Sequence, residues 1–234
     1  MISRPSGFKF IERNHDSTIL LIPGWATDYR IFGSLDLPFN YLMPDRFSPF
    51  DFGKMFSTAL DEQKLNGVSI LGWSMGSFIA AEVASKYPQN FKDIILVSVK
   101  KRYDKEMIEN IKAYINKNKI GYLCKFYNDF FSDREKEASD WFRRNLLKKY
   151  IKEMSPDLLL EGLDYLSGAE LRTEDLKGLS IKFIHGEDDR IAPVDEAARI
   201  AKALPRAVFV SIEAAGHAPF LRTEFKEAFS GGRG

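Results

Sequence analysis

The chain has 234 residues, with 34 lysines and arginines against 33 aspartates and glutamates, and its net charge of +1 gives no reason to expect a nucleic-acid partner. The length suits one domain, residues 1–234, with a core built around a single large sheet. The chain has a single cysteine, Cys124, so it cannot form an internal disulfide, which fits a reducing compartment. No apolar run is long enough to span a bilayer, and none resembles a secretion signal. We therefore expect a cytoplasmic protein.

Short apolar runs rich in β-branched residues predict the buried strands of a mostly parallel sheet. Segments of helical period lie between and after these runs, and this alternation predicts an α/β fold with helices flanking the sheet. In chain order, the expected strands are an antiparallel edge strand at Phe8–Glu12 and parallel strands at Thr18–Ile22, Val68–Leu71, Asp93–Val99, Ile181–Ile184 and Ala207–Ile212. The expected helices are Met75–Tyr87, Val194–Leu204 and Glu224–Phe229.

One stretch, from about residue 100 to residue 174, interrupts this alternation. It contains no strand pattern but carries the spacing of short amphipathic helices. The segments with that spacing are Lys105–Asn116, Tyr122–Phe131, Glu135–Lys152 and Asp157–Leu166. We therefore expect a helical cap inserted between two strands of the sheet.

Ser74 is the central residue of a Gly-x-Ser-x-Gly pentapeptide, Gly72-Trp73-Ser74-Met75-Gly76. The pentapeptide follows a predicted strand and opens a predicted helix, which is typical of a serine nucleophile exposed at a sharp turn. Glycines on either side are needed because side chains there would collide. A helix N-cap serine with glycines for packing is the alternative interpretation.

A serine hydroxyl is a weak nucleophile unless a positioned base takes its proton, so this hypothesis requires a histidine. Of the three present, we favour His217, because it lies just past the last predicted strand, where a loop can reach the carboxyl edge of the sheet. We expect His15 to be a solvated turn residue and His185 to have a packing or loop role.

The histidine in turn needs a carboxylate that orients it, located between the serine and the histidine in chain order. The loop after the strand Ile181–Ile184 supplies three candidates, Glu187, Asp188 and Asp189. A turn made of charged residues is the alternative interpretation of this loop.

The oxyanion of an acyl-transfer intermediate is stabilised by two preorganised backbone amides. We predict that Met75, which follows the nucleophile, provides one of them. Trp25, in the loop that leaves the strand Thr18–Ile22, is expected to provide the other and to line the acyl pocket; a core tryptophan beside a turn is the alternative.

Taken together, these motifs resemble the α/β hydrolases across almost the whole chain. Within that superfamily, Pro23-Gly24-Trp25, the pentapeptide around Ser74 and Gly216-His217-Ala218-Pro219-Phe220 are similar to the pimeloyl-acyl-carrier-protein methyl ester esterases of biotin synthesis. The segments Gly162–Leu166 and Glu170–Leu176 also resemble the end of the cap in that family.

The resemblance implies a serine carboxylesterase that hydrolyses the methyl ester of pimeloyl-acyl-carrier protein without a metal or cofactor. It favours Asp189 as the acid, because family loops of the form Gly-x-x-Asp-x-x-x-Pro place a carboxylate at that position. The residues that it places at the site are the catalytic Ser74, Asp189 and His217, the oxyanion and acyl contacts Trp25 and Met75, and the cap residues Phe126 and Phe130, which match a substrate-contacting helix.

The predicted cap is locally basic, with Arg143, Arg144 and Lys148 close together. An acyl-carrier protein is strongly acidic, so a basic rim beside the pocket would steer it, although a solvated helix face explains the same charges. We expect a monomer. The competing functions are a general carboxylesterase acting on short-chain soluble esters, a related lyase of menaquinone synthesis, and a non-catalytic binding protein on the same scaffold.

Overall fold

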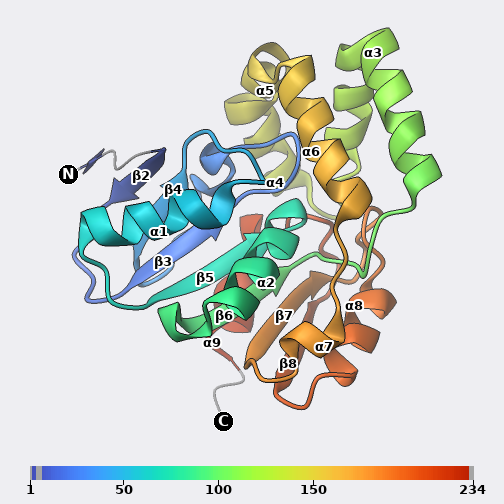
Figure 1. The fold of residues 1–234 in the computed structure, drawn as a ribbon. Helices are drawn as coiled ribbons and strands as arrows, with labels where there is room; N and C mark the ends of the chain where they lie inside the picture. Colours follow the sequence, from blue (N-terminus) through green and yellow to red (C-terminus); the bar gives the residue numbers. More distant parts are fainter. Residues whose placement is uncertain (1, 4–6, 232–234) are drawn as a thin grey trace.

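A twisted sheet of eight strands forms the centre of the molecule in the computed structural model, which describes residues 2–3 and 7–231 (Figure 1). The strand order is β1-β2-β4-β3-β5-β6-β7-β8, and the strands from β4 to β8 run parallel, whereas β2 pairs antiparallel with β4 and β1 antiparallel with β2. The strands are β1 (Ile2–Ser3), β2 (Phe8–Ile11), β3 (Thr18–Ile22), β4 (Asn40–Pro44), β5 (Val68–Trp73), β6 (Phe91–Val97), β7 (Ile181–Gly186) and β8 (Ala207–Ile212).

Helices surround this sheet, with α1 and α2 on the front face and α9 behind in the view of Figure 1. No helix of the described residues is long and apolar enough to cross a bilayer. The α-helices are α1 (Phe52–Gln63), α2 (Met75–Lys86), α3 (Lys105–Asn128), α4 (Lys136–Phe142), α5 (Lys148–Glu153), α6 (Pro156–Gly168), α7 (Thr173–Leu176), α8 (Val194–Lys202) and α9 (Phe225–Ser230). Short 3₁₀ turns occur at Tyr29–Phe32, Pro88–Asn90 and Pro219–Leu221, and a π-helical turn at Arg143–Leu147 joins α4 to α5.

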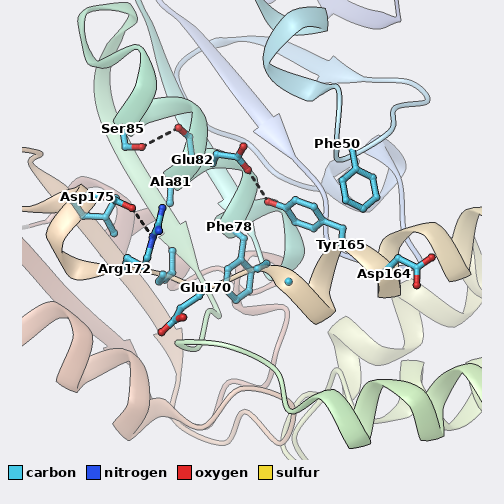
Figure 2. Close-up of a pocket in the computed structure, with 14 residues that line it drawn as sticks. Phe50, Phe78, Ala81, Glu82, Ser85, Asp164, Tyr165, Glu170, Arg172 and Asp175 are labelled. Atoms are coloured by element: carbon cyan, nitrogen blue, oxygen red, sulfur yellow. Dashed lines mark hydrogen bonds and ion pairs between the residues drawn. The ribbon is translucent and has the colours of Figure 1, made fainter.

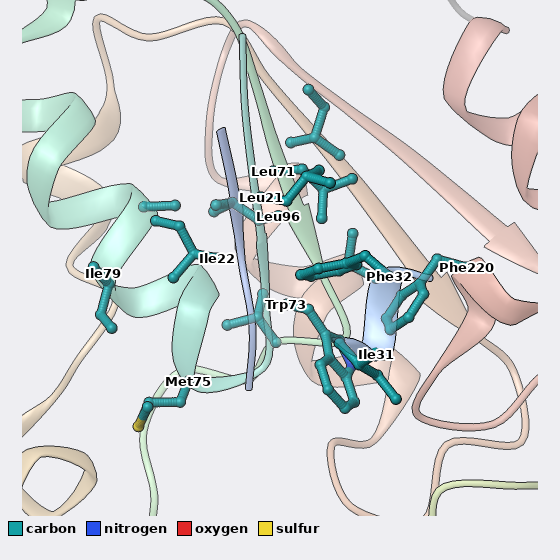
Figure 3. Close-up of a cluster of buried hydrophobic side chains, with 14 of the residues drawn as sticks. Leu21, Ile22, Ile31, Phe32, Leu71, Trp73, Met75, Ile79, Leu96 and Phe220 are labelled. Carbon is teal, nitrogen blue, oxygen red and sulfur yellow. The ribbon is translucent and has the colours of Figure 1, made fainter. Parts of the chain in front are cut away.

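The central strands consist mainly of apolar residues because the sheet is covered on both faces. Every residue of β3 and β5 is buried. Figure 3 shows side chains of these strands, among them Leu21 and Leu71, packed with Ile79 of α2 and with Phe220 near the end of the chain. The predicted α/β fold with a mostly parallel sheet is therefore confirmed.

The sequence prediction missed the short elements β1 and α7 and two longer ones, β4 and α1. The strand β4 begins with Asn40 and ends with Pro44, so turn-forming residues flank only three apolar ones, although its last four residues are buried. The helix α1 buries Phe52, Phe56, Ala59 and Leu60, a helical spacing that the presence of Gly53 in its first turn obscures.

The helices α3 to α6 lie between β6 and β7 in the chain and form a cap above the carboxyl edge of the sheet (Figure 1). The two helices expected at the start of the cap form one element that is kinked at Asn118, whose side chain accepts a hydrogen bond from the amide of Gly121 and so begins the second half. Residues 100–174 contain no strand, only an isolated bridge between Arg102 and Glu170.

Candidate active site

Ser74 occupies a strained turn between β5 and α2. Its backbone has φ 55° and ψ −117°, a conformation that non-glycine residues rarely adopt. A side chain at Gly72 would place its Cβ 2.2 Å from the carbonyl oxygen of Gly76, and one at Gly76 would lie 2.3 Å from that of Ile22. Both glycines are therefore required for the turn to form against the neighbouring strand.

Ser74 is buried, with the residue 6% exposed, and its side chain interacts with that of Tyr103. Tyr103 lies just past β6, whose residue Val97 pairs with Trp73 beside the turn. Burial raises the pKa of Tyr103 more than the contact with Ser74 lowers it, so the phenol is protonated at neutral pH. Sequence analysis missed Tyr103, although its position after a strand adjacent to β5 was an available signal.

His217 lies in the loop after β8, and its Nδ1 atom is 2.8 Å from Oδ2 of Asp189. Its ring packs between Trp73 and Phe130, with centroids 5.5 and 5.8 Å away. Its Nε2 atom is buried and has no hydrogen-bond partner among the described residues. The structure thus brings His217 and Asp189 together and leaves Nε2 available to a further group.

Asp189 is the only buried residue of the three acidic candidates in its loop, since Glu187 and Asp188 are exposed. Its Oδ1 accepts hydrogen bonds from the amides of Ile191 and Ala192, at 2.8 and 2.9 Å. Burial by itself raises the pKa of Asp189. The charge of the neighbouring histidine and the hydrogen bonds outweigh burial and hold this pKa well below its usual range. Asp189 is therefore an anion that orients the imidazole.

His185 is a second histidine at this carboxylate. Its Nε2 is 2.7 Å from the carbonyl oxygen of Ala192 and 3.3 Å from Oδ2 of Asp189. Because a carbonyl oxygen can only accept a hydrogen bond, Nε2 of His185 carries the proton and donates it to Ala192. The same Nε2 atom also faces the carboxylate of Asp189. His185 therefore fixes the Asp189 loop, which is the packing role that the sequence predicted, although it also contacts a residue of the predicted site. The third histidine, His15, lies in the turn before β3, where its backbone carbonyl accepts a hydrogen bond from the side chain of Asn40.

The loop that follows β3 carries Trp25, and cap residues cover it. The indole Nε1 of Trp25 donates to the carbonyl oxygen of Leu159 in α6 at 2.8 Å. A Cβ atom at Gly162, also in α6, would lie 2.6 Å from the Trp25 ring and 3.4 Å from Sδ of Met75. The two predicted oxyanion residues therefore meet under α6, where a glycine permits the close approach. As the first residue of α2, Met75 has an amide without an intrahelical partner.

Phe126 lies in the last turn of α3 and Phe130 in the turn that follows it, and both pack against residues of the predicted site. The ring of Phe126 packs edge-on against Trp25 with centroids 4.8 Å apart, and that of Phe130 packs against Trp73 at 5.2 Å. These two side chains therefore contact both halves of the predicted site, the oxyanion loop and the nucleophile turn.

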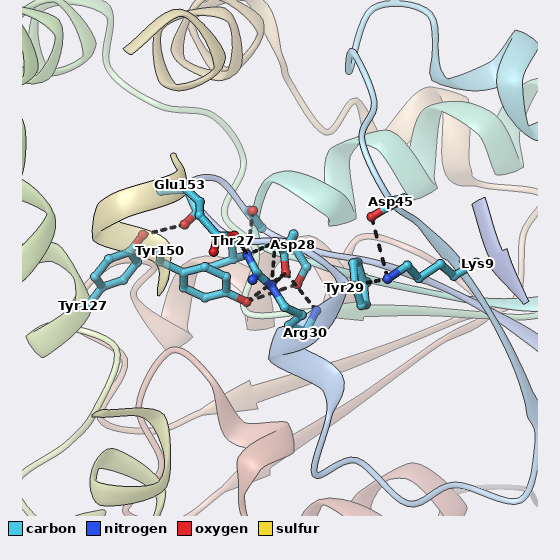
Figure 4. A network of polar contacts seen from close by, with 11 residues as sticks. Lys9, Thr27, Asp28, Tyr29, Arg30, Asp45, Tyr127, Tyr150 and Glu153 are labelled. Carbon is cyan, nitrogen blue, oxygen red and sulfur yellow. Dashed lines mark hydrogen bonds and ion pairs between the residues drawn. The ribbon is translucent and has the colours of Figure 1, made fainter. Parts of the chain in front are cut away.

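A polar network joins the cap to the same oxyanion loop (Figure 4). The hydroxyl of Tyr127 in α3 donates to the carbonyl oxygen of Ala26 at 2.6 Å. Arg30 pairs with Asp28 at 2.6 Å and with Glu153 of α5 at 2.7 Å. The cap is thus joined by a hydrogen bond and an ion pair to the loop that follows β3.

A cavity of about 500 Å³ opens beside the site, between α2 and the end of the cap (Figure 2). Its wall includes Phe78 and Tyr165, and the hydroxyl of Tyr165 donates to Glu82 at 3.3 Å. The ring of Phe78 also packs against Tyr103, with centroids 6.1 Å apart. Phe78 and Tyr103 therefore connect the wall of this cavity to the nucleophile. In the part of the chain that the structure describes, no cluster of histidine, cysteine or carboxylate side chains could hold a metal ion.

Comparison with known proteins places this site in context. The model of a hydrolase family described as serine aminopeptidase, S33, matches residues 49–223, a region that includes Ser74, Asp189 and His217. The pimeloyl-[acyl-carrier protein] methyl ester esterase of Wigglesworthia glossinidia brevipalpis is 30% identical over 233 residues, which cover 88% of this chain and 89% of that protein. The enzyme of the same name from Nitrosomonas europaea is 28% identical over 175 residues, 69% of this chain and 68% of that protein, and the match to the one from Yersinia pseudotuberculosis (strain IP32953) spans 62% of its length.

Solved structures agree on the fold. A bromoperoxidase from Bacillus anthracis superposes with a TM-score of 0.82 at 19% identity, over 95% of this chain and 93% of that one. A thermophilic esterase from Thermogutta terrifontis superposes with a TM-score of 0.79 at 19% identity, over 95% of this chain and 90% of that one. At such identities the likeness establishes the α/β-hydrolase fold alone.

Proposed function

We propose that this protein hydrolyses the methyl ester of pimeloyl-acyl-carrier protein as a step of biotin synthesis in the cytoplasm. The chain belongs to the serine aminopeptidase S33 family of α/β hydrolases and is a carboxylic ester hydrolase. The observation that carries the proposal is the buried pair of His217 and Asp189, 2.8 Å apart, where His217 is hydrogen-bonded to Trp73, the residue before a serine held in a strained turn. The relatives that bear this activity in their names support the choice of substrate.

The proposed reaction begins with proton transfer from Ser74 to Nε2 of His217 as the serine oxygen bonds to the ester carbonyl carbon. The C–O bond to the methoxy group then breaks, and methanol leaves with the proton from His217. Water attacks the acyl-enzyme by the same route and releases the free carboxylate.

The amides of Trp25 and Met75 are proposed to bind the oxyanion that forms at the carbonyl carbon. Both residues are nearly buried, at 5% and 6% exposed, so their dipoles act in a site from which water is largely excluded. Phe126 packs on Trp25 and is proposed to contact the acyl chain.

The carrier protein is proposed to dock on the basic cap residues Arg143, Arg144 and Lys148. All three are exposed, and within the described part of the chain none of them forms an ion pair with a carboxylate. They lie on the π-helical turn and the start of α5, and Arg143 also donates to Asn128 at the end of α3, two residues past Phe126. An acidic partner bound there would be attracted at low salt and released as salt rises.

Substitution of Ser74 tests the nucleophile. We expect Ser74→Ala to lower kcat for p-nitrophenyl acetate by about 10⁵-fold or more, because no other oxygen takes its place in the turn. Ser85→Ala, an exposed serine at the end of the same helix, is the matched control and should retain wild-type turnover. If the Ser74→Ala enzyme retained the wild-type kcat, Ser74 would be excluded as the nucleophile.

The substrate is tested by comparing methyl pimeloyl-acyl-carrier protein with free methyl pimelate and with short p-nitrophenyl esters. We expect kcat/KM for the carrier-bound ester to exceed that for the free esters, and to fall steeply for Arg143→Glu with Arg144→Glu at low salt. If the enzyme hydrolyses the free esters with the same kcat/KM as the carrier-bound ester, the protein is an esterase but the proposed substrate is refuted.

A further inference from the structure

The turn that joins α3 to α4 in the cap is bonded to the loop that carries His217. The amide of His217 donates to the carbonyl oxygen of Phe130 at 2.8 Å. The hydroxyl of Ser132 donates to the carbonyl oxygen of Ala214 at 2.6 Å. Gly216, one residue before the histidine, donates its amide to Oε2 of Glu135 at 2.7 Å. Three hydrogen bonds thus connect segments that are more than 80 positions apart in the chain.

The two segments approach each other as closely as their backbones allow. A Cβ atom at Gly216 would lie 2.5 Å from the carbonyl oxygen of Phe130 and 2.9 Å from both Oε2 of Glu135 and the amide nitrogen of Ser132. Any larger residue would force the loop away from the cap. The contact is therefore specific in geometry as well as in hydrogen bonding.

Glu135 is an unusual residue to find at this contact, because the whole residue is 4% exposed. Its Oε2 accepts from two amides, those of Ser132 at 2.8 Å and Gly216 at 2.7 Å. Its Oε1 is buried without a hydrogen-bond partner among the described residues. Burial raises the pKa of Glu135, although the two amides and the charge of Arg222 partly offset this effect. Arg222 donates to the carbonyl oxygen of Ala214 at 3.2 Å.

A buried carboxylate lowers stability unless its oxygens are well satisfied, so stability alone is a poor explanation for Glu135. Its bond to Gly216 fixes the backbone directly before the catalytic base, while the ring of that base is fixed by Asp189 at the other end. A general base must be held within hydrogen-bonding reach of the proton that it removes.

We propose that Glu135 is a positioning residue for ester hydrolysis, which acts through the backbone of Gly216 to hold His217 where its Nε2 can reach Ser74. This inference rests on the proposed role of His217 as the base and does not depend on the carrier protein. The cap therefore contributes to the rate of the chemical step as well as to the choice of substrate.

The experiment compares Glu135→Ala and Glu135→Gln with the wild-type enzyme and with Glu137→Ala, an exposed glutamate two positions further on. Turnover of p-nitrophenyl acetate is divided by the number of active sites, which are titrated to completion with a fluorophosphonate probe. We expect Glu135→Ala to lower kcat per site about tenfold or more with KM within about twofold, because the base is displaced while the ester still binds. Glu135→Gln keeps an acceptor oxygen for both amides and should restore kcat to within about threefold of the wild type.

A merely structural role would lower the melting temperature and the number of titrated sites while leaving kcat per site unchanged. That result for Glu135→Ala, or equal losses of kcat per site in Glu135→Ala and Glu137→Ala, would overturn the inference. Failure of the wild-type enzyme to hydrolyse p-nitrophenyl acetate would instead refute the proposed esterase, so the two failures are distinguishable.

Discussion

The nucleophile turn and the histidine loop are held in place by different means. Ser74 is fixed by its own sequence neighbours, since Gly72 and Gly76 allow the turn to close against β3. The loop around His217 instead depends on distant partners, with Glu135 and Phe130 in the cap on one side and Asp189 on the other. A local pattern thus determines one half of the site, and tertiary contacts determine the other.

This difference explains which elements a sequence can predict. The turn around Ser74 and the order of strands and helices follow from local periodicity and from glycine placement, so they could be predicted. The contact of Glu135 with Gly216 could not, because it joins segments 81 positions apart in the chain and has no local pattern. Glu135 lies within a continuous run of charged residues, from Asp133 to Glu137, and resembles any other acid at the start of a helix until its burial is known.

The side-chain anchor of the histidine loop is expected to give the largest effect in that loop. Asp189→Asn places an amide where the anion orients Nδ1 of His217, so the imidazole loses its preferred tautomer and the stabilisation of its charged form. We expect kcat to fall by about 10⁴-fold with p-nitrophenyl acetate as substrate. Asp188→Asn, its exposed neighbour, is the matched control. Comparable losses in the two variants would contradict the assignment of Asp189.

The nucleophile turn is tested by steric substitution of its second glycine. In Gly76→Ala the added methyl group would lie 2.3 Å from the carbonyl oxygen of Ile22, so we expect a loss of about 2–4 kcal/mol in the free energy of unfolding. Gly168→Ala, at the end of α6, meets no atom within 4 Å and should leave the protein as stable as the wild type. Urea titrations check both values. Equal stability in the two variants would show that the turn tolerates a side chain.

The side chain of Trp73 links the two halves of the site by a hydrogen bond. The indole Nε1 of Trp73, the residue before Ser74, donates to the carbonyl oxygen of His217 at 2.6 Å. Trp73→Phe leaves that buried carbonyl without this donor, at a cost of about 1–3 kcal/mol in stability, and we expect kcat to fall about fivefold as the loop relaxes. Trp141→Phe in α4 repeats the substitution away from the histidine and should keep wild-type kcat. Unchanged kcat in Trp73→Phe would mean that the two halves are held independently.

The smallest expected effect is a pH dependence of stability that separates the two carboxylates on either side of the histidine loop. Burial raises the pKa of Glu135 above its usual 4.5, so its contribution to stability is complete below the pKa of the unfolded chain and is lost as pH rises through the higher folded value. The pKa of Asp189 is lowered instead, so its contribution is present above the unfolded value and is lost as pH falls. On acidification from about pH 7 to about pH 4, the wild type should therefore gain stability relative to Glu135→Gln. Over that range it should not gain stability relative to Asp189→Asn. Urea unfolding of the three proteins across this range measures both differences. No gain relative to Glu135→Gln would contradict the raised pKa of Glu135, and a gain relative to Asp189→Asn would contradict the lowered pKa of Asp189.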